Sequence, residues 1–276
     1  MPVAYTSGGH VGAYRGRDVI RRSGNPRMFH RLRDAAAAQP RCPRNPSGSG
    51  VARADTALVD RFLQFVGAGE FPCVGAKAAL ARDAIEVHAF DSLGARGNDP
   101  RLLAALTRFG ASLDGADAGD TTVRSLVAVF DGPDGADELR FEAMLWAQLR
   151  RLHALDVARG QAWASDVSAD PADPAFSFSL GGHPFFVIGL HPGASRLARR
   201  FEQPALVFNS HRQFDALRAD GRYGKMQAAT RERDVALQGS INPNLADFGT
   251  ASEARQYSGR AVDPAWSCPF QVLEGR

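Results

Sequence analysis

Hydrophobic positions along the chain follow two patterns, a period near 3.6 residues that is typical of helices and short alternating or uninterrupted runs that are typical of strands. The helical pattern marks 55–67, 73–83, 99–114, 136–156, 194–201, 211–220 and 225–238. The strand pattern marks 85–90, 125–130, 205–209 and a hairpin over 176–190 that turns at Gly181 and Gly182. Helices alternating with short strands predict a mixed α/β fold, and we expect a single compact domain whose short-stranded sheet is flanked by helices.

Two of the helices carry an apolar stripe that predicts which side faces the core. The stripe of the first helix is Leu58, Phe62, Phe65 and Val66, and that of the long helix is Leu139, Met144, Leu145, Leu149 and Leu152. Asp55 or Thr56 is expected to cap the first helix, because short polar side chains accept the free amides at helix starts.

The first 54 residues differ in composition from the rest and predict a flexible extension, with the folded domain over 55–276. The extension is rich in Gly, Arg, Pro and Ser. Residues 1–55 contain ten Arg and three Asp, about +7, whereas the whole chain carries +3, so the remainder is about −4. A basic arm is typical of nucleic-acid binding, but no nucleic-acid motif accompanies it, and we expect no nucleic-acid partner.

Composition and missing signatures exclude several classes of protein. No apolar run approaches 18 residues and no signal-peptide core follows the N-terminal basic residues, so we expect a cytoplasmic protein with no membrane partner. Three cysteines, Cys42, Cys73 and Cys268, do not suggest a disulfide framework. The phosphate-binding, dinucleotide-binding, zinc-protease and covalent-haem motifs are absent from the sequence.

Two histidines each follow a strand-like run, His191 after the hairpin and His211 after 205–209. If those strands are parallel neighbours, both imidazoles lie at the carboxyl edge of one sheet, where α/β proteins bind ligands. A position at a helix start would keep His211 neutral and able to bind a metal. The density of His, Arg, Asn, Gln and Tyr over 185–270 therefore predicts a site for an anionic cofactor or substrate.

Several motifs occur together over roughly 60–272: FPCVGAKAAL, GLHPxASRxARRF, VFNxHxQF, LQGxINPxLxDFG, SEARQYSGR and WxCPF. In type and order they resemble the YqcI/YcgG family, whose characterised members are haem proteins that N-hydroxylate guanidino groups. The resemblance implies a haem-dependent monooxygenase that converts L-arginine to Nω-hydroxy-L-arginine in antibiotic biosynthesis of the D-cycloserine type. It implies non-covalent haem b, O₂ and an external reductase as electron donor, with a homo-oligomer possible.

Three alternatives stay open at this point. The first is N-hydroxylation of another guanidino compound, and the second is a haem-binding sensor or carrier without turnover. The third is a binding protein that holds no haem, since each polar side chain has an ordinary structural role available to it.

The resemblance also assigns roles to particular side chains. His191 is the first choice for the axial ligand, with His211, Cys73 and Cys268 as alternatives, and a Cys at a helix start is expected to have a lowered thiol pKa. The remaining predicted haem contacts are Ser195, Arg196, Arg199, Arg200, Phe214 and Tyr257. The predicted catalytic set is His211, Glu142, Asp247 and Glu253, with Asp234 as a further carboxylate for a guanidinium. The predicted substrate contacts are Asn242, Arg255 and Arg260, with Gln238 as a further hydrogen-bonding group.

Overall fold

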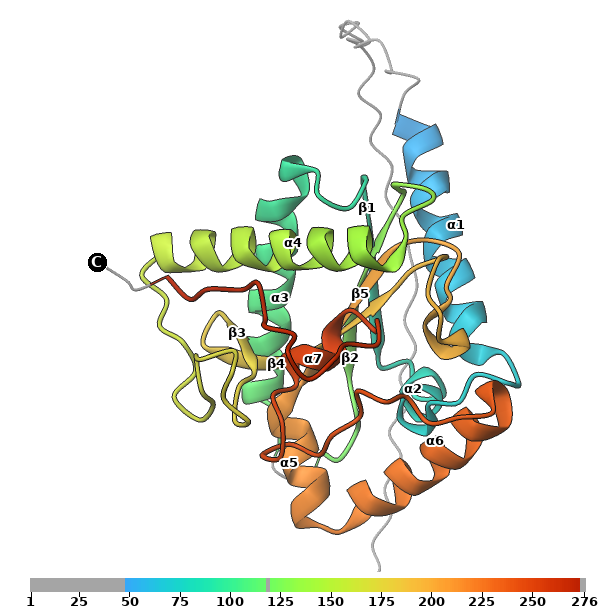
Figure 1. Ribbon diagram of the computed structural model, residues 1–276. Helices are drawn as coiled ribbons and strands as arrows, with labels where there is room; N and C mark the ends of the chain where they lie inside the picture. The colour runs from blue at the N-terminus through green and yellow to red at the C-terminus, as the bar shows by residue number, and fades with distance from the viewer. Residues whose placement is uncertain (1–47, 118–119, 274–276) are drawn as a thin grey trace, which may run out of the picture. The chain divides into compact units, whose positions relative to one another are not determined.

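The computed structural model describes residues 48–117 and 120–273 (Figure 1). Most of the predicted extension, residues 1–47 with Cys42, therefore lies outside the described residues. The first helix, α1, spans Gly48–Gly67, so the predicted start at 55 is wrong and Asp55 lies within the helix. The predicted start of this helix is too late because the residues before Asp55 were assigned to the extension from their composition alone.

A five-stranded mixed sheet forms the centre of the fold, as predicted, with strand order β1-β2-β5-β4-β3 (Figure 1). The strands are β1 (Ile85–Phe90), β2 (Ser125–Phe130), β3 (Phe178–Leu180), β4 (His183–Leu190) and β5 (Ala205–Ser210). Only β1 and β2 are parallel among the pairs of this sheet, and β3–β4 form the predicted hairpin. Gly181 and Gly182 both have positive φ at its turn, which glycine adopts without a steric penalty.

The two strands that precede His191 and His211 are antiparallel, so the expectation that they are parallel is wrong. Leu190 pairs with Ala205 and Phe185 pairs with Ser210. The carboxyl end of β4 therefore lies beside the start of β5, and the two histidines lie at opposite ends of the strand pair. The chain between the strands holds only a 3₁₀ turn, η2 (Leu197–Arg199), in place of the predicted helix over 194–201. A parallel return would need a crossover, usually a helix.

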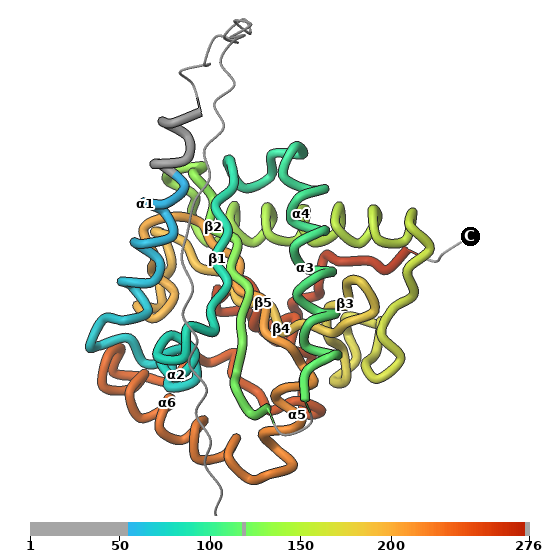
Figure 2. The backbone as a smooth tube through the Cα atoms, turned by 180° about the vertical axis from the view of Figure 1, so that it is seen from behind, coloured from blue at the N-terminus to red at the C-terminus, as the bar shows by residue number. Residues whose placement is uncertain are grey.

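One face of the sheet carries the larger hydrophobic core. It is covered by α3 (Asp99–Asp114), which follows the 3₁₀ turn η1 (Arg96–Asn98), and by α4 (Glu138–Ala158) (Figure 2). In α4 the predicted residues Leu145, Leu149 and Leu152 are fully buried. Leu139 is 65% exposed, so its place in the stripe is wrong; it lies beside the buried side of α4, which Phe141 and Glu142 occupy at that turn.

The other face of the sheet is only partly filled by side chains. Helices α1 and α2 (Val74–Leu80) contact β1, while α5 (His211–Ala219) contacts β4 and β5. Helix α6 (Arg222–Gln238) packs against α2 and α5, and the short α7 (Ala254–Tyr257) contacts β4. None of the helices described is both long and apolar enough to cross a membrane.

Candidate functional site

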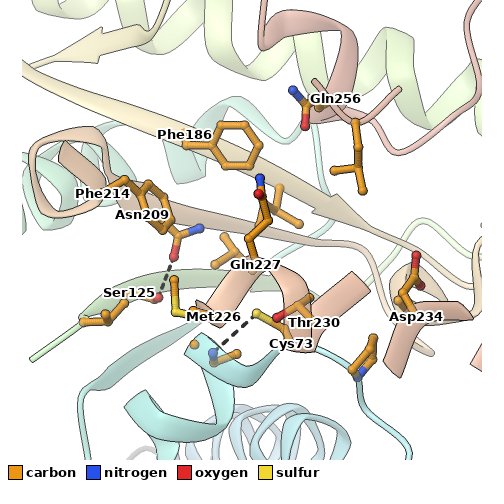
Figure 3. A pocket seen from close by; sticks show the side chains of 18 of the residues that line it. Cys73, Ser125, Phe186, Asn209, Phe214, Met226, Gln227, Thr230, Asp234 and Gln256 are labelled. Carbon is orange, nitrogen blue, oxygen red and sulfur yellow. Dashed lines mark hydrogen bonds between the residues drawn. The ribbon is translucent and has the colours of Figure 1, made fainter. Parts of the chain in front are cut away.

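A cavity of about 320 Å³ lies between the partly filled face of the sheet and the helices α2, α5 and α6 (Figure 3). Its walls are mainly apolar, with side chains from the sheet on one side and from the helices on the other. The apolar lining includes Phe62, Phe71, Ile85, Val127, Phe186, Ile188, Leu190, Val207, Phe214, Met226 and Phe248. Both its size and its apolar lining are typical of pockets that hold a small molecule or cofactor, which span about 300–1,000 Å³.

A small set of polar side chains also faces this cavity. Of the predicted site residues the lining contains Cys73, Arg196, Arg199, His211, Asp234, Asn242 and Glu253, together with the aromatic Phe214. These residues come from six separate segments, and the fold brings them together on one face of the sheet. Convergence of a few polar groups in an apolar pocket is the usual arrangement of a binding site.

Cys73 lies at the N-terminus of α2, next to Met226 and Thr230 of α6 in Figure 3. Its Sγ accepts a hydrogen bond from the Ala76 N–H at 3.4 Å. Burial raises the pKa of the Cys73 thiol, although that bond, a second amide and the positive charge of Arg199 each lower it. The expected lowered pKa is therefore wrong, because desolvation outweighs the stabilisation by amides and arginine.

The Met226 side chain packs against Gly75, next to Cys73. A Cβ placed on Gly75 would lie 3.1 Å from Met226 Sδ and 4.0 Å from Cys73 Sγ. The backbone of α2 therefore approaches the Met226 thioether closely at this point, and a larger residue at position 75 would have to displace Met226.

Two arginines from the turn after β4 border the cavity, but they differ in their partners. Arg196 is buried and bonds to Asp234 Oδ2 and to both the hydroxyl and the carbonyl of Ser240. Arg199 donates instead to three backbone carbonyls, those of Gly189, Tyr257 and Gln256. Burial lowers the pKa of Arg199 to about 10. Its charge has no carboxylate within salt-bridge distance among the described residues, which leaves an unpaired, half-buried cation at the cavity wall.

Asp234 carries an oxygen without a partner. Its side chain is 11% exposed, Oδ2 faces Arg196, and Oδ1 makes no hydrogen bond among the described residues. An unpaired buried carboxylate oxygen is costly, about 1–3 kcal/mol or more. A ligand with N–H donors would remove that cost.

His211 and Glu253 form a second polar group in the lining. Glu253 Oε1 accepts a hydrogen bond from the Tyr257 hydroxyl at 2.6 Å, and Oε2 lies 3.7 Å from His211 Nδ1. His211 Nε2 faces Asp215 Oδ2 at 3.5 Å, and the Phe248 ring lies over the imidazole with 4.1 Å between ring centres. Tyr257 itself is fully buried in the core, and burial followed by the Glu253 charge raises its pKa well above the ordinary value.

His191 does not line the cavity. Its ring is 1% exposed and stacks on Phe141 of α4 at 4.2 Å, and neither ring nitrogen has a partner among the described side chains. Burial lowers the pKa of His191, so the ring is neutral at pH 7. This position follows from the antiparallel pairing, which carries the end of β4 away from His211.

Other predicted site residues also lie outside the cavity lining. Glu142 and Arg260 pair with each other, Arg255 donates to the carbonyls of Asp263 and Trp266, and Asp247 is exposed and accepts from Gln227. Ser195 bonds to Glu138, Arg200 to the Ala194 carbonyl, and Gln238 to the Leu197 amide. Cys268 packs against the core, where burial raises its thiol pKa to about 12.

Sequence reasoning missed several residues of the lining. Ser125 donates to Asn209 Oδ1 at 2.6 Å across β2 and β5, and both appear at one side of the view in Figure 3. Met226, Gln227 and Thr230 enter from α6. The helical period predicted α6, but its polar and apolar residues are mixed, so no stripe indicated which side faces a ligand.

Fold and site together define a mixed α/β protein with a ligand-sized cavity on one face of its sheet. The chain belongs to the YqcI/YcgG family, whose sequence pattern matches residues 62–271. It is 29% identical to YcgG of Bacillus subtilis (strain 168) over 224 residues, which are 75% of this chain and 83% of YcgG. It is 27% identical to YqcI of the same organism over 225 residues, 74% of this chain and 82% of YqcI.

Both relatives carry the description of an uncharacterized protein, so their similarity gives the family and no activity. No solved structure matches the chain significantly.

Proposed function

We propose that this protein is a haem-dependent oxygenase that N-hydroxylates the guanidino group of L-arginine. The observation that carries the proposal is the cavity itself, which combines apolar walls, a thiol and a buried carboxylate oxygen without a partner. The motifs that resemble haem proteins of the family lie in the same segments, including FPCVGAKAAL around Cys73 and the HPxASR turn with Arg196.

The lining fits a haem by its chemistry. Apolar side chains of the sheet and of α6 would enclose the flat ring, and Cys73, a potential axial ligand, borders the same cavity. Arg199, a half-buried cation without a carboxylate partner among the described residues, would pair with a haem propionate or offset the charge of a thiolate. When bound, a thiolate-ligated haem would supply the O₂ chemistry that no side chain provides.

Cys73 replaces His191 as our first choice for the axial ligand. Its Sγ lies at the cavity, whereas His191 is enclosed by core side chains. The raised pKa of the Cys73 thiol describes the metal-free site, and metal binding displaces the proton of a coordinating thiol. His211 also lines the cavity, but both its ring nitrogens face carboxylates, which suits a proton-carrying role better than ligation.

The substrate's guanidinium needs carboxylate partners, and the cavity offers two. Asp234 Oδ1 lacks a hydrogen bond, and Glu253 is fixed by Tyr257 so that Oε2 is left for another donor. A guanidinium carries five N–H donors in a planar fork that matches carboxylate oxygens. For the substrate's carboxylate, Arg218 and Arg231 line the cavity and pair with the exposed carboxylates of Asp215 and Asp247, whereas Arg255 and Arg260 do not line it.

The experiment that tests this function is a product assay. Haem-reconstituted protein is mixed with L-arginine, O₂ and a ferredoxin–reductase pair with NADPH, and Nω-hydroxy-L-arginine is quantified by mass spectrometry. We expect product from the wild type and at least about a tenfold loss of kcat/KM in Asp234→Asn, since a charged hydrogen bond contributes about 1.5–3 kcal/mol.

Asp220→Asn is the matched control, because Asp220 is exposed, pairs with Arg222 and does not line the cavity. Bound haem without any product from arginine or from other guanidino compounds would contradict the enzyme and favour a haem sensor or carrier. Equal activity of the two variants would contradict the role of Asp234.

A further inference from the structure

His211 lies between a carboxylate at the cavity and a carboxylate at the protein surface. Its Nδ1 is 3.7 Å from Glu253 Oε2, and its Nε2 is 3.5 Å from Asp215 Oδ2. The side chains of His211 and Glu253 are 3% and 5% exposed, whereas that of Asp215 is 54% exposed. Three ionisable groups therefore form a row from solvent to the cavity wall, in the order Asp215, His211 and Glu253.

The local structure fixes the direction of this row. Ser210 caps α5, so His211 is its first residue and Asp215 follows one turn later on the same side of the helix. Glu253 comes from the segment before α7, and the Tyr257 hydroxyl holds its Oε1. Only Oε2 is left to face the imidazole.

We propose that His211 carries protons from Asp215 at the surface to Glu253 in the cavity, an inference that rests on the proposed function. N-hydroxylation converts one guanidinium N–H, O₂, two electrons and two protons into N–OH and water. An external reductase of the ferredoxin or flavin class supplies the electrons. The protons must cross a lining that is mainly apolar, and the His211 row provides titratable groups across it.

The proton transfer uses both nitrogens of the imidazole. Nε2 takes a proton from Asp215, which is replenished by solvent, and Nδ1 releases one to Glu253. Both gaps exceed a normal hydrogen bond, so each closes through a small side-chain movement or one bridging water. The charged groups around His211 are Asp215 on its own helix, Glu253, and Asp166 from the loop before β3. Arg218 Nη1 donates to Asp215 Oδ1 at 2.7 Å, so Asp215 uses Oδ2 towards His211.

The first arm of the test needs no turnover. The haem-free protein, labelled with ¹⁵N at histidine, is studied by NMR at one pH to record the ring ¹⁵N chemical shifts of His211. Asp215→Asn is expected to move the His211 Nε2 resonance, because the carboxylate that faces this nitrogen at 3.5 Å is removed. Asp220→Asn is the matched control and should leave the resonance in place, since Asp220 is exposed at the end of α5 and pairs with Arg222. An unchanged Nε2 resonance in Asp215→Asn would overturn the link from His211 to the surface.

The second arm measures coupling in the haem-loaded enzyme with the ferredoxin–reductase pair. In Asp215→Asn and His211→Gln, the ratio of hydrogen peroxide released to hydroxyarginine formed is expected to rise at least about tenfold. Slow proton delivery would let reduced oxygen leave the cavity before it reacts with arginine. Asp215 does not line the cavity but pairs with Arg218, which does, so the KM for arginine of each variant is measured beside the ratio. A ratio within twofold of the wild type in both variants would overturn the proposal.

The two arms also separate this proposal from the function on which it rests. A wild-type enzyme that binds haem but forms no hydroxyarginine would contradict the proposed function, and the His211 proposal as a catalytic path would fall with it. If the wild-type enzyme forms product and the ratio of hydrogen peroxide to hydroxyarginine stays the same in Asp215→Asn and His211→Gln, the proton path alone would be overturned.

Discussion

Glu142 Oε2 accepts two hydrogen bonds from Arg260, at 2.9 Å from Nε and 2.6 Å from Nη2. The pair joins α4 to the segment after α7 on the face of the sheet that carries the larger core. Two residues expected to bind opposite ends of a substrate are therefore partners of each other. Their contact points to a structural role.

We expect Glu142→Gln to lower the free energy of unfolding by about 2–3 kcal/mol. Removing one partner of a fully buried pair costs about 3–5 kcal/mol, and Arg260 is 20% exposed, which reduces the cost. Chemical denaturation measures the change, with Glu70→Gln at an exposed position as control. A normally stable Glu142→Gln protein with weakened arginine binding would restore the predicted catalytic role.

His191→Ala is expected to destabilise the protein and to leave its haem in place. The ring is buried against Phe141, and truncation of a buried ring leaves a cavity that costs about 2–4 kcal/mol. Denaturation and the haem-to-protein ratio after reconstitution are the two measurements. Loss of haem from a folded His191→Ala protein would return His191 to the position of axial ligand.

Gly75→Leu is expected to lower haem affinity at least about tenfold, or 1.4 kcal/mol, because the new side chain would have to displace Met226 from its place beside Cys73 in the cavity wall. Gly224→Leu on α6 is the control, since a Cβ at Gly224 meets nothing within 4 Å. Haem titration followed by absorbance compares them. If both variants bind haem equally well, the haem does not occupy the space beside Cys73.

The protein is expected to lose stability as the pH falls below about 6.5. Burial lowers the pKa values of His153, His183 and His191 in the folded state. Below the unfolded value near 6.5 the unfolded chain binds protons that the folded chain does not, so unfolding becomes more favourable.

Denaturation at pH 7.5 and pH 5.5 measures this effect. Asp156, whose pKa burial raises, acts in the opposite direction, so the comparison is made with His183→Gln. The stability of His183→Gln should depend less on pH over this range. An equal dependence in both proteins would exclude His183 as a source of the effect.

The sequence predicted the sheet and most helices because their periods are strong. The hairpin at Gly181 and Gly182 and the buried strand at 125–130 are examples. The pairing direction of β4 and β5 was not visible, since both strands are apolar and either direction buries them. Leu139 shows the same limit, because a helical stripe does not indicate where the buried side of the helix ends.

The candidate site was predictable only in part. Motif residues such as Cys73, Arg196 and Glu253 were singled out and do line the cavity. His191 belongs to an equally prominent motif but packs in the core, because motif membership does not distinguish a buried structural ring from a ligand. Met226 and Gln227 carry no motif-like signature, and only the packing of α6 across the sheet brings them to the site.

The measurement that tests the central claim most directly is the absorption spectrum of the haem-reconstituted protein in its ferrous–CO form, recorded for the wild type and Cys73→Ser. A Soret band near about 450 nm in the wild type, lost in Cys73→Ser and kept in Cys268→Ser, is the predicted result for thiolate ligation by Cys73. A band near about 420 nm that survives in Cys73→Ser would indicate a neutral imidazole and contradict the assignment of the ligand. No Soret band after reconstitution would contradict the haem protein altogether.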